Sequence, residues 1–511
     1  MKAYSKILFN RVLIIGVALL FQILFFVGLI WVFKEYSPAF YGFSVFISIV
    51  VVLWIVYDNS NPAYKIAWVI PICLMPIFGG IFYLVFGGNQ LTKKEREKLQ
   101  WVEDKTFELV GSREEVLTRM AKSSKMAANQ AGYIQNFAYG PAYDDSETEY
   151  YPIGEDKFEA FKRELRKAKK FIFMEYFIIE EGQMWSEILE ILKEKAAQGV
   201  DVRVIYDDMG CMLTLPFRYD QYLNTLGIKA VVFNPLIPIM SAKYNTRDHR
   251  KITVIDGHTA FTGGINLADE YINAIKKHGH WKDMGILVKG QAVWSFTVMF
   301  LTLWDYVNRT ESDYQAYAYE PESGYSLKAT GFVQPFADNP LDNEAVGENI
   351  YLNLINKAKD YVYITSPYLI IDSEMETALS IAAKSGVDVR IMTPHRADKW
   401  YVHEVTRSYY QELIRNGVRI FEYEPGFIHG KTFVVDDEYA VVGTINMDYR
   451  SLYLHFECGL WMYNTSSVID VRNDHLDTLE RCIEITNGEM EQQPFIRKLV
   501  QLVLRLFAPL M

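Results

Sequence analysis

The 511-residue sequence contains only four cysteines, Cys73, Cys211, Cys458 and Cys482, and no two of them form a CxxC pair. Isolated thiols of this kind argue against a disulfide framework or a zinc site and are typical of a reducing compartment. The sequence also lacks an HExxH motif, a carboxylate cluster and a Walker-type glycine loop. We therefore expect chemistry that needs neither a metal nor another cofactor.

A surplus of positive charge is also missing, because the formal net charge is −11. Proteins that bind nucleic acids usually carry a basic domain or stripe that displaces counterions from the phosphates. The charge balance therefore argues weakly against a nucleic-acid partner.

Charged residues are absent from two long apolar stretches, Val12–Phe33 and Ala39–Tyr57. Either stretch is long enough for a helix to cross the roughly 30 Å hydrocarbon layer of a bilayer. A third stretch, Ile66–Phe86, contains prolines and glycines that favour a broken, re-entrant or interfacial segment over a third span. Residues 1–90 are thus predicted to form a membrane anchor with two transmembrane helices and a third, broken or re-entrant hydrophobic segment, with three true spans as the alternative.

Basic residues lie on both sides of this anchor. Lys2, Lys6 and Arg11 precede it, and a second group at residues 93–98 follows it. The positive-inside rule places both groups in the cytoplasm, which requires an even number of crossings. We expect a multi-pass protein whose termini and catalytic part face the cytoplasm.

The last segment, residues 491–511, is predicted to be an amphipathic helix. Its apolar face comprises Ile496, Leu499, Val500, Val503, Leu506 and Phe507, and its polar face comprises Arg497, Lys498, Gln501 and Arg505. Such a helix suits the surface of an anionic membrane. Packing against the catalytic domain is the alternative.

One motif occurs twice. The segment DHRKITVIDGHTAFTGGIN, residues 248–266, returns 180 residues later as IHGKTFVVDDEYAVVGTIN. In each copy a His is followed by a Lys two places on, an Asp seven places on, a Gly 14 places on and an Asn 17 places on. The flanking segments KAKKFIFMEYFII and AAQGVDVRVI return as KAKDYVYITSPYLII and AAKSGVDVRIM, in the same order. The chain therefore contains two related halves.

Each half has the same predicted order of elements. An apolar strand is followed by a helix, with Met375, Ala378, Leu379 and Ala382 at helical spacing in the second copy, then by a VDVR strand and finally by the strand pair of the motif. This alternation predicts an α/β fold. We place a helical linker at residues 91–135, a first domain at 136–320 and a second domain at 330–490.

The repeated residues suit phosphodiester chemistry. On a strand, residues two apart point to the same face, so His249 with Lys251, and His429 with Lys431, project into a shared cleft. One imidazole can attack phosphorus while the other protonates the leaving oxygen. Both lysines, together with the amides of Asn266 and Asn446, can bind the non-bridging oxygens and offset the charge of the transition state.

Four acids are candidates for supporting roles. A nucleophilic imidazole needs an acceptor for its second nitrogen, and Asp283 and Glu457 follow the two histidines at similar offsets of 34 and 28 residues. Asp256 and Asp436 stand between apolar runs and turn-like segments. We expect the latter two to brace the turn or the lysine rather than to transfer protons.

The paired HxKxxxxD motif resembles the signature of the phospholipase D superfamily, and matches His249, Lys251, Asp256 and His429, Lys431, Asp436. The longer segments HRKITVIDGHTAFTGGINLADEY and HGKTFVVDDEYAVVGTINMDYRSLYLHFE, the membrane segment NPAYKIAWVIPICLMPIFGGIFYLVFG and the terminal RLFAPLM resemble bacterial cardiolipin synthases over nearly the whole chain. Asp248 and His455 depart from this pattern, in which Asn is expected at both places.

This resemblance implies two similar phospholipase D-like α/β/α sandwich halves packed around one active site, after an α-helical anchor in the bacterial cell membrane. It implies that two phosphatidylglycerol molecules react to give cardiolipin and glycerol through a phosphatidyl-histidine. His249 would be the nucleophile and His429 the general acid and base. Phosphatidylglycerol and anionic membrane lipids are the expected partners, without nucleic acid, and a homo-oligomer is compatible with the pattern.

The catalytic residues leave two alternatives open. A membrane-bound phospholipase D would use water as the acceptor, and another synthase would take phosphatidylethanolamine as the donor. A non-enzymatic membrane scaffold is disfavoured because both His–Lys sets are intact, and a nuclease is disfavoured by the membrane segments and the acidic balance.

Overall fold

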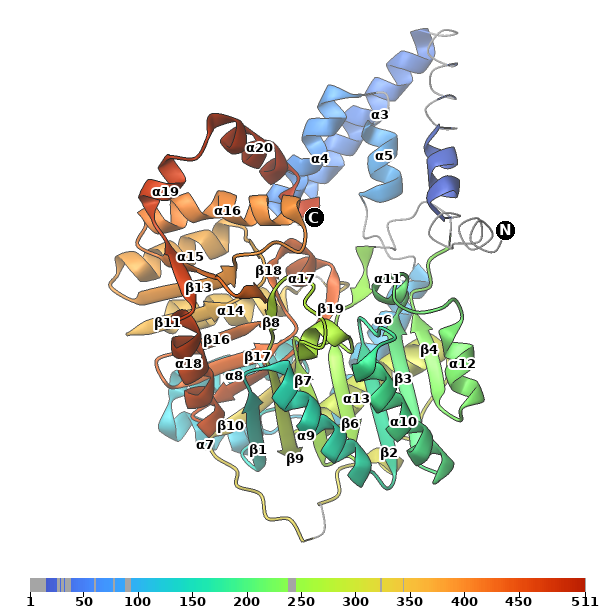
Figure 1. Ribbon diagram of the computed structural model, residues 1–511. Helices are drawn as coiled ribbons and strands as arrows, with labels where there is room; N and C mark the ends of the chain where they lie inside the picture. Colours follow the sequence, from blue (N-terminus) through green and yellow to red (C-terminus); the bar gives the residue numbers. More distant parts are fainter. Residues whose placement is uncertain are drawn as a thin grey trace.

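The fold is described from a computed structural model (Figure 1), which covers residues 15–24, 28, 32, 38–58, 61–76, 79–87, 93–237, 245–321, 324–342 and 344–510. The predicted span Val12–Phe33 is described only in part, and Lys2, Lys6 and Arg11 lie outside these residues. The two basic groups that set the predicted orientation are therefore not both described.

The described N-terminal residues include helical residues 15–24 and the helices α3 (Pro38–Tyr57), α4 (Pro62–Leu74) and α5 (Gly79–Phe86). The last three pack together. The third apolar stretch is thus divided between α4 and α5. Val51, Ile55, Trp68, Ile72 and Tyr83 form their small common core. Within the described residues, no helix combines the length and apolar character that a membrane crossing requires, so the predicted two-span topology is not confirmed.

The segment predicted as a linker is helical and contacts both halves of the body. It forms α6 (Lys93–Val110), α7 (Glu114–Ser123) and α8 (Lys125–Phe137). Helix α6 packs on α13 (Val293–Asn308) of the first half, where the indole of Trp294 donates a hydrogen bond to the Leu109 carbonyl at 3.0 Å. Helices α7 and α8 instead contribute to the core of the second half.

The first half is built on a mixed seven-stranded sheet with the order β1-β9-β7-β6-β2-β3-β4. The apolar run FIFMEY forms β2, which is buried on both faces, as expected for a central strand. The strands are β1 (Ser146–Tyr151), β2 (Phe171–Tyr176), β3 (Asp201–Asp207), β4 (Lys229–Phe233), β6 (Lys251–Ile255), β7 (Thr259–Gly263) and β9 (Gly285–Gly290). Its other helices are α9 (Gly154–Lys167), α10 (Gln183–Ala197), α11 (Asp208–Cys211) and α12 (Tyr219–Thr225), with short 3₁₀ turns at Asp269–Ile272 and Tyr314–Tyr317.

The second half repeats this order as β10-β19-β17-β16-β11-β13-β14 and adds β20 at the far edge. Its strands are β10 (Phe332–Asp338), β11 (Tyr361–Thr365), β13 (Asp388–Pro394), β14 (Arg419–Tyr423), β16 (Thr432–Val435), β17 (Tyr439–Gly443), β19 (His455–Tyr463) and β20 (Cys482–Ile485). Its helices are α14 (Val346–Lys357), α15 (Ser373–Lys384), α16 (Trp400–Arg415), α17 (Tyr449–Tyr453), α18 (Ser466–Leu479), α19 (Asn487–Glu491) and α20 (Phe495–Leu506), followed by a 3₁₀ turn, η4 (Ala508–Leu510). Matching strand orders confirm the predicted duplicated α/β fold.

The two halves share one core. Apolar residues from β6, β7 and β9 of the first sheet and from β16, β17 and β19 of the second belong to a single buried cluster, which also includes α13 and α18. The outer face of the first sheet is covered by α9 and α10, and that of the second by α14, α15 and α16. The sheets therefore pack through their inner faces, with α9, α10, α14, α15 and α16 on the outside (Figure 1).

Candidate active site

His249 is held by a strand pair that crosses between the halves. Strand β5 (Arg247–Asp248) pairs in parallel with the start of β19 from the second half, and the His249 amide donates to the Phe456 carbonyl at 2.9 Å. Because the paired strand continues to Glu457, the carboxylate of that residue reaches the ring, with Nδ1 of His249 2.8 Å from Oε1. His249 and Glu457 are both buried.

His429 is held in the same way, with the roles of the two halves exchanged. Strand β15 (Gly426–Ile428) of the second half pairs in parallel with β8 (His280–Lys282) of the first, and the His429 amide donates to the Lys282 carbonyl at 2.7 Å. Asp283 follows directly, and its Oδ2 lies 2.6 Å from Nδ1 of His429. Each candidate histidine is thus paired with the acid of the other half.

The two lysines lie next to the histidines. Lys251 begins β6 and Lys431 immediately precedes β16, and the ammonium of each donates to the carbonyl of the His two residues before it. Burial lowers the pKa of Lys251 to about 8 and that of Lys431 to about 7. The Nζ atom of Lys431 also lies 3.1 Å from Nε2 of His429. A bound anion would favour the charged form of both lysines.

Burial of the site lowers the pKa of its imidazoles and raises the pKa of its acids. Burial, followed by the charges of Lys251 and Lys431, holds the pKa of both His249 and His429 well below the usual range. Burial raises the pKa of Glu457 to about 7 and that of Asp283 to about 6. A neutral ring that donates its Nδ1 hydrogen to a carboxylate carries its lone pair on Nε2.

Asp256 and Asp436 brace the chain at equivalent places. Asp256 accepts hydrogen bonds from the amides of Lys169, Lys170 and Phe171 at 2.7–2.9 Å. Asp436 accepts three equivalent bonds from residues 359–361. Both aspartates have φ near +50° in the turn after the motif strand. Their carboxylates thus join this turn to the start of the central strand, β2 or β11, and do not contact the lysine heads.

The two asparagines are buried but differ in their contacts. Asn266 accepts from the Ile178 amide at 3.1 Å and donates to the Tyr271 hydroxyl at 2.8 Å, so one of its amide hydrogens is already used. The Oδ1 atom of Asn446 is buried without a hydrogen-bond partner. Asn446 therefore has more capacity than Asn266 to accept a bond from a ligand.

The sequence pattern did not single out several residues around the site. Thr444 donates a short hydrogen bond to Oε2 of Glu457 and orients that carboxylate. Lys157 is buried near Asp283 and Lys251, and burial lowers its pKa to about 7. The indole of Trp281 lies 5.5 Å from the ring of His429. Thr444 and Trp281 stand within or near the repeated segments, whereas no repeat marks Lys157.

The two departures from the expected motif have different surroundings. Asp248 is buried, and its Oδ1 lies 3.1 Å from Nε of Arg250, which also contacts Oε1 of Glu175 at 2.6 Å. Arg250 therefore offsets the extra negative charge beside His249. The ring of His455 lies near that of His249, with 5.7 Å between the ring centroids.

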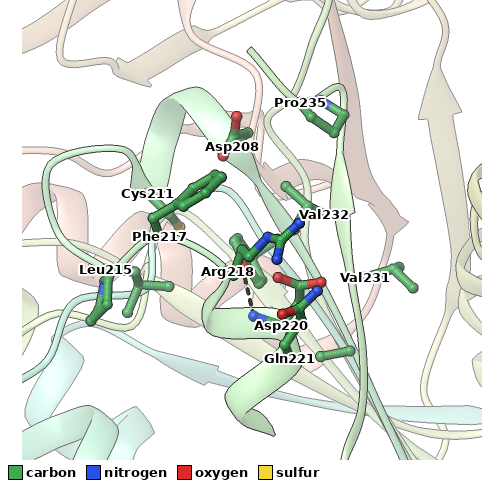
Figure 2. Close-up of a pocket in the computed structure, with 13 residues that line it drawn as sticks. Asp208, Cys211, Leu215, Phe217, Arg218, Asp220, Gln221, Val231, Val232 and Pro235 are labelled. Carbon is green, nitrogen blue, oxygen red and sulfur yellow. Dashed lines mark hydrogen bonds between the residues drawn. The ribbon is translucent and has the colours of Figure 1, made fainter. Parts of the chain in front are cut away.

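One group among the described residues has the composition of a metal site. Ligand atoms of His249, His455 and Glu457 lie within 4.8 Å of one another. A separate cavity of about 370 Å³ lies beside α11, α12 and β4, where Figure 2 shows Arg218, Asp220 and Gln221 together. None of the candidate catalytic residues lines this cavity.

Comparison with known proteins places these residues in a family context. The family model described as "Cardiolipin synthase, PLD-like domain" matches residues 161–298 and 351–478, and the model described as "Phospholipase_D-nuclease N-terminal" matches residues 46–88. Both motif copies and all four site acids fall within the first match.

Similar proteins cover nearly the whole chain. A protein of Streptococcus mutans described only as uncharacterized is 44% identical over 90% of this chain and 99% of its own length. A cardiolipin synthase of Alkalihalophilus pseudofirmus is 34% identical over 94% of this chain and 95% of its own, and one of Geobacillus thermodenitrificans is 35% identical over 91% and 92%.

A solved structure supports the fold. The chain resembles a phosphatidylserine synthase of Haemophilus influenzae with a TM-score of 0.55 and 16% identity, over 74% of this chain and 96% of that one. At this identity, the similarity concerns the fold alone.

Proposed function

The chain belongs to the family of cardiolipin synthases with phospholipase D-like domains, and on this premise we propose that it transfers a phosphatidyl group from one phosphatidylglycerol to another, giving cardiolipin and glycerol. One observation carries the proposal: two buried imidazoles, each oriented by an acid of the opposite half, lie close enough to the same two buried lysines for the lysine charges to lower the pKa of both rings. This set can bind a phosphodiester and exchange its substituents.

In the first step, Nε2 of His249 attacks phosphorus while the bond to the glycerol oxygen breaks. Glu457 holds the Nδ1 hydrogen of His249, and the imidazolium of His429 gives its proton to the departing oxygen. The negative charge of the bound phosphodiester favours the protonated form of His429 before this step. Lys251 and Lys431 offset the charge on the equatorial oxygens.

In the second step, the hydroxyl group of another phosphatidylglycerol loses its proton to His429 and attacks the phosphatidyl-histidine. The N–P bond breaks, His249 returns to its neutral form, and cardiolipin leaves. Water in place of this hydroxyl would give phosphatidic acid, and a phosphatidylethanolamine donor would release ethanolamine instead of glycerol.

These outcomes can be separated with the full-length protein and phosphatidylglycerol labelled in its phosphatidyl group. We expect cardiolipin and glycerol in equal amounts, and activity that survives EDTA. Phosphatidic acid as the main product would identify a hydrolase. If EDTA abolishes activity and one added metal restores it, the result would contradict a mechanism in which lysines, without a metal, offset the charge on phosphate.

We also propose that the protein works at a membrane and that α20 rests on the bilayer. The polar face of α20 is occupied by the protein itself: Arg497 and Gln501 contact Glu404 at 2.7–2.9 Å, and Arg505 contacts Glu376 at 3.1 Å. The opposite, apolar face is exposed, including Phe495, Ile496, Leu499, Leu502 and Val503. An apolar face with this much exposure suits the headgroup and acyl boundary of a bilayer.

The position of α20 supports the same surface. The turn η4 that follows α20 packs against α4, and Ala508 and Ala63 belong to one apolar cluster. Asn61, which caps α4, donates hydrogen bonds of 3.0 Å to Asp372 and Tyr453 of the second half. Figure 1 shows α20 at the same end of the molecule as α3–α5, which expose further apolar side chains.

An environment-sensitive probe can test this placement. In the full chain with Cys73 replaced by Ser, a fluorophore on Leu502→Cys should be quenched by spin-labelled lipids in proteoliposomes, because Leu502 is 67% exposed on the apolar face. A fluorophore on Lys193→Cys of α10, away from this end, serves as the control. Equal quenching of the two fluorophores would contradict bilayer contact. So would shielding of the fluorophore at position 502 from the spin-labelled lipids that increases with protein concentration.

A further inference from the structure

His455 is a third imidazole beside the repeated histidines, and the mechanism above does not use it. It begins β19, two residues before Glu457, and its ring is tilted by 45° to that of His249. Both of its ring nitrogens are buried without a hydrogen-bond partner. Leaving a buried polar group unsatisfied is costly, so this ring has a nitrogen available to bind a ligand.

The neighbours of His455 are themselves metal-ligand types. Oε1 of Glu457 lies 3.9 Å from Nδ1 of His455 and 2.8 Å from Nδ1 of His249. Thr444 holds the other carboxylate oxygen, so Oε1 remains directed between the two rings. A set of two histidines and one glutamate is a recurrent zinc-binding combination that leaves one coordination position open.

Metal binding requires the three side chains to adjust their distances. Bonds of about 2.0–2.2 Å in a tetrahedral site place the ligand atoms about 3.3 Å from one another. The contact between His249 and Glu457 must open from 2.8 Å and that between His455 and Glu457 must close from 3.9 Å. Both changes are about half an ångström. The ligand atoms of His249 and His455, which lie within 4.8 Å of each other, must close by up to about 1.5 Å through rotation of the side chains.

We propose that His249, His455 and Glu457 form an inhibitory site for a divalent transition metal such as Zn²⁺. The inhibition, unlike the metal binding, rests on the proposed role of His249 as nucleophile. The Nδ1 hydrogen that His249 shares with Glu457 leaves as a proton, and its lone pair becomes a bond to the metal. The metal then withdraws electron density from Nε2 and occupies Glu457, so attack on phosphorus is suppressed.

The ligand types predict selectivity. Imidazole nitrogens suit Zn²⁺, Ni²⁺ and Cu²⁺, whereas Mg²⁺ and Ca²⁺ prefer oxygen ligands. Nearby cationic groups, Lys251 and Arg450, oppose any divalent cation. The site should therefore discriminate strongly against metals that gain little from nitrogen ligands.

The test compares the full-length wild type with His455→Asn, a change that introduces the residue expected in similar proteins. Binding of Zn²⁺ is measured by competition with a chromogenic chelator, and binding of Co²⁺ by its visible absorption, neither of which requires turnover. Loss of one ligand should weaken Zn²⁺ binding about ten-fold or more. Basal cardiolipin formation should be retained, while the Zn²⁺ concentration for half-inhibition rises by the same factor.

His395→Asn is the matched control, because His395 also hydrogen-bonds a glutamate, Glu422, at 2.9 Å but lies outside this group. It should bind and respond to Zn²⁺ as the wild type does, and Mg²⁺ should inhibit none of the three proteins. Equal Zn²⁺ affinity of the wild type and His455→Asn would overturn the proposed site. If Zn²⁺ binding depends on His455 but Zn²⁺ does not inhibit cardiolipin formation, only the inhibitory role is overturned. If no sample forms cardiolipin, the result contradicts the proposed function and leaves the Zn²⁺ binding data to decide the site.

Discussion

His429→Ala is expected to stop cardiolipin formation while still allowing a slow covalent adduct on His249. Without His429 the leaving glycerol oxygen receives no proton and the acceptor hydroxyl is not deprotonated, and loss of a general acid or base usually costs about 10²- to 10⁴-fold. His249→Ala removes the attacking nitrogen and should form no adduct at all. Brief reaction with phosphatidylglycerol labelled in its phosphatidyl group, followed by quenching and peptide mapping, locates the acid-labile label.

This peptide mapping can directly contradict the assignment of His249 as the nucleophile and His429 as the general acid and base. The repeat makes the histidines nearly equivalent, and the order proposed follows the superfamily resemblance. Label on His429 of the wild type, with His249 unmodified, would reverse the roles. His395→Ala, which removes a histidine that is 42% exposed and lies outside the site, should leave both adduct formation and turnover unchanged.

The crossed pairing of acids and histidines predicts that Glu457→Gln and Asp283→Asn fail at different steps. Glu457 holds the proton of His249, so Glu457→Gln should slow adduct formation, because an amide that donates to Nδ1 stabilises the wrong tautomer. Asp283 holds His429, so Asp283→Asn should slow transfer from the adduct to the acceptor as well as proton donation. Each change should lower turnover by about 10²- to 10⁴-fold.

Rapid-quench measurement of adduct formation and decay separates the two variants. Adduct that accumulates in Asp283→Asn but not in Glu457→Gln supports the crossed arrangement, and the opposite result would indicate pairing within each half. Glu484→Gln, at an exposed ion pair with Arg419, is the matched control and should behave as the wild type.

The pH profile gives a second readout of the same pairing. The pKa of Glu457 is raised to about 7 and that of Asp283 to about 6 by burial, so both acids lose their charge as the pH falls through this range. Catalysis needs the ionised acids, and activity should therefore decline from pH 7 towards pH 6 and below. Glu457→Gln should lose the decline near pH 7, and Asp283→Asn should lose the decline near pH 6, because each lacks the carboxylate that titrates there.

The sequence determined the fold class and singled out the residues of the candidate site. Periodic apolar patterns and the repeated segments predict two α/β halves, because strand and helix spacing are local properties of the chain. The VDVR strands and the helix at residues 373–384 are confirmed. The repeat identifies the four candidate residues that both copies retain: His249, Lys251, His429 and Lys431. His455 and Thr444 become candidates only because the structure places them next to Glu457.

Only the tertiary structure decided which acid serves which histidine. Offsets along the chain relate Asp283 to His249 and Glu457 to His429. In the structure, the short parallel strand pairs β5–β19 and β15–β8 join opposite halves, so Glu457 contacts His249 and Asp283 contacts His429. Strand pairing between distant segments depends on how the two sheets pack, which no local pattern specifies. The same holds for α20: the sequence predicts two faces, and the acids of α15 and α16 decide that the polar face turns inward.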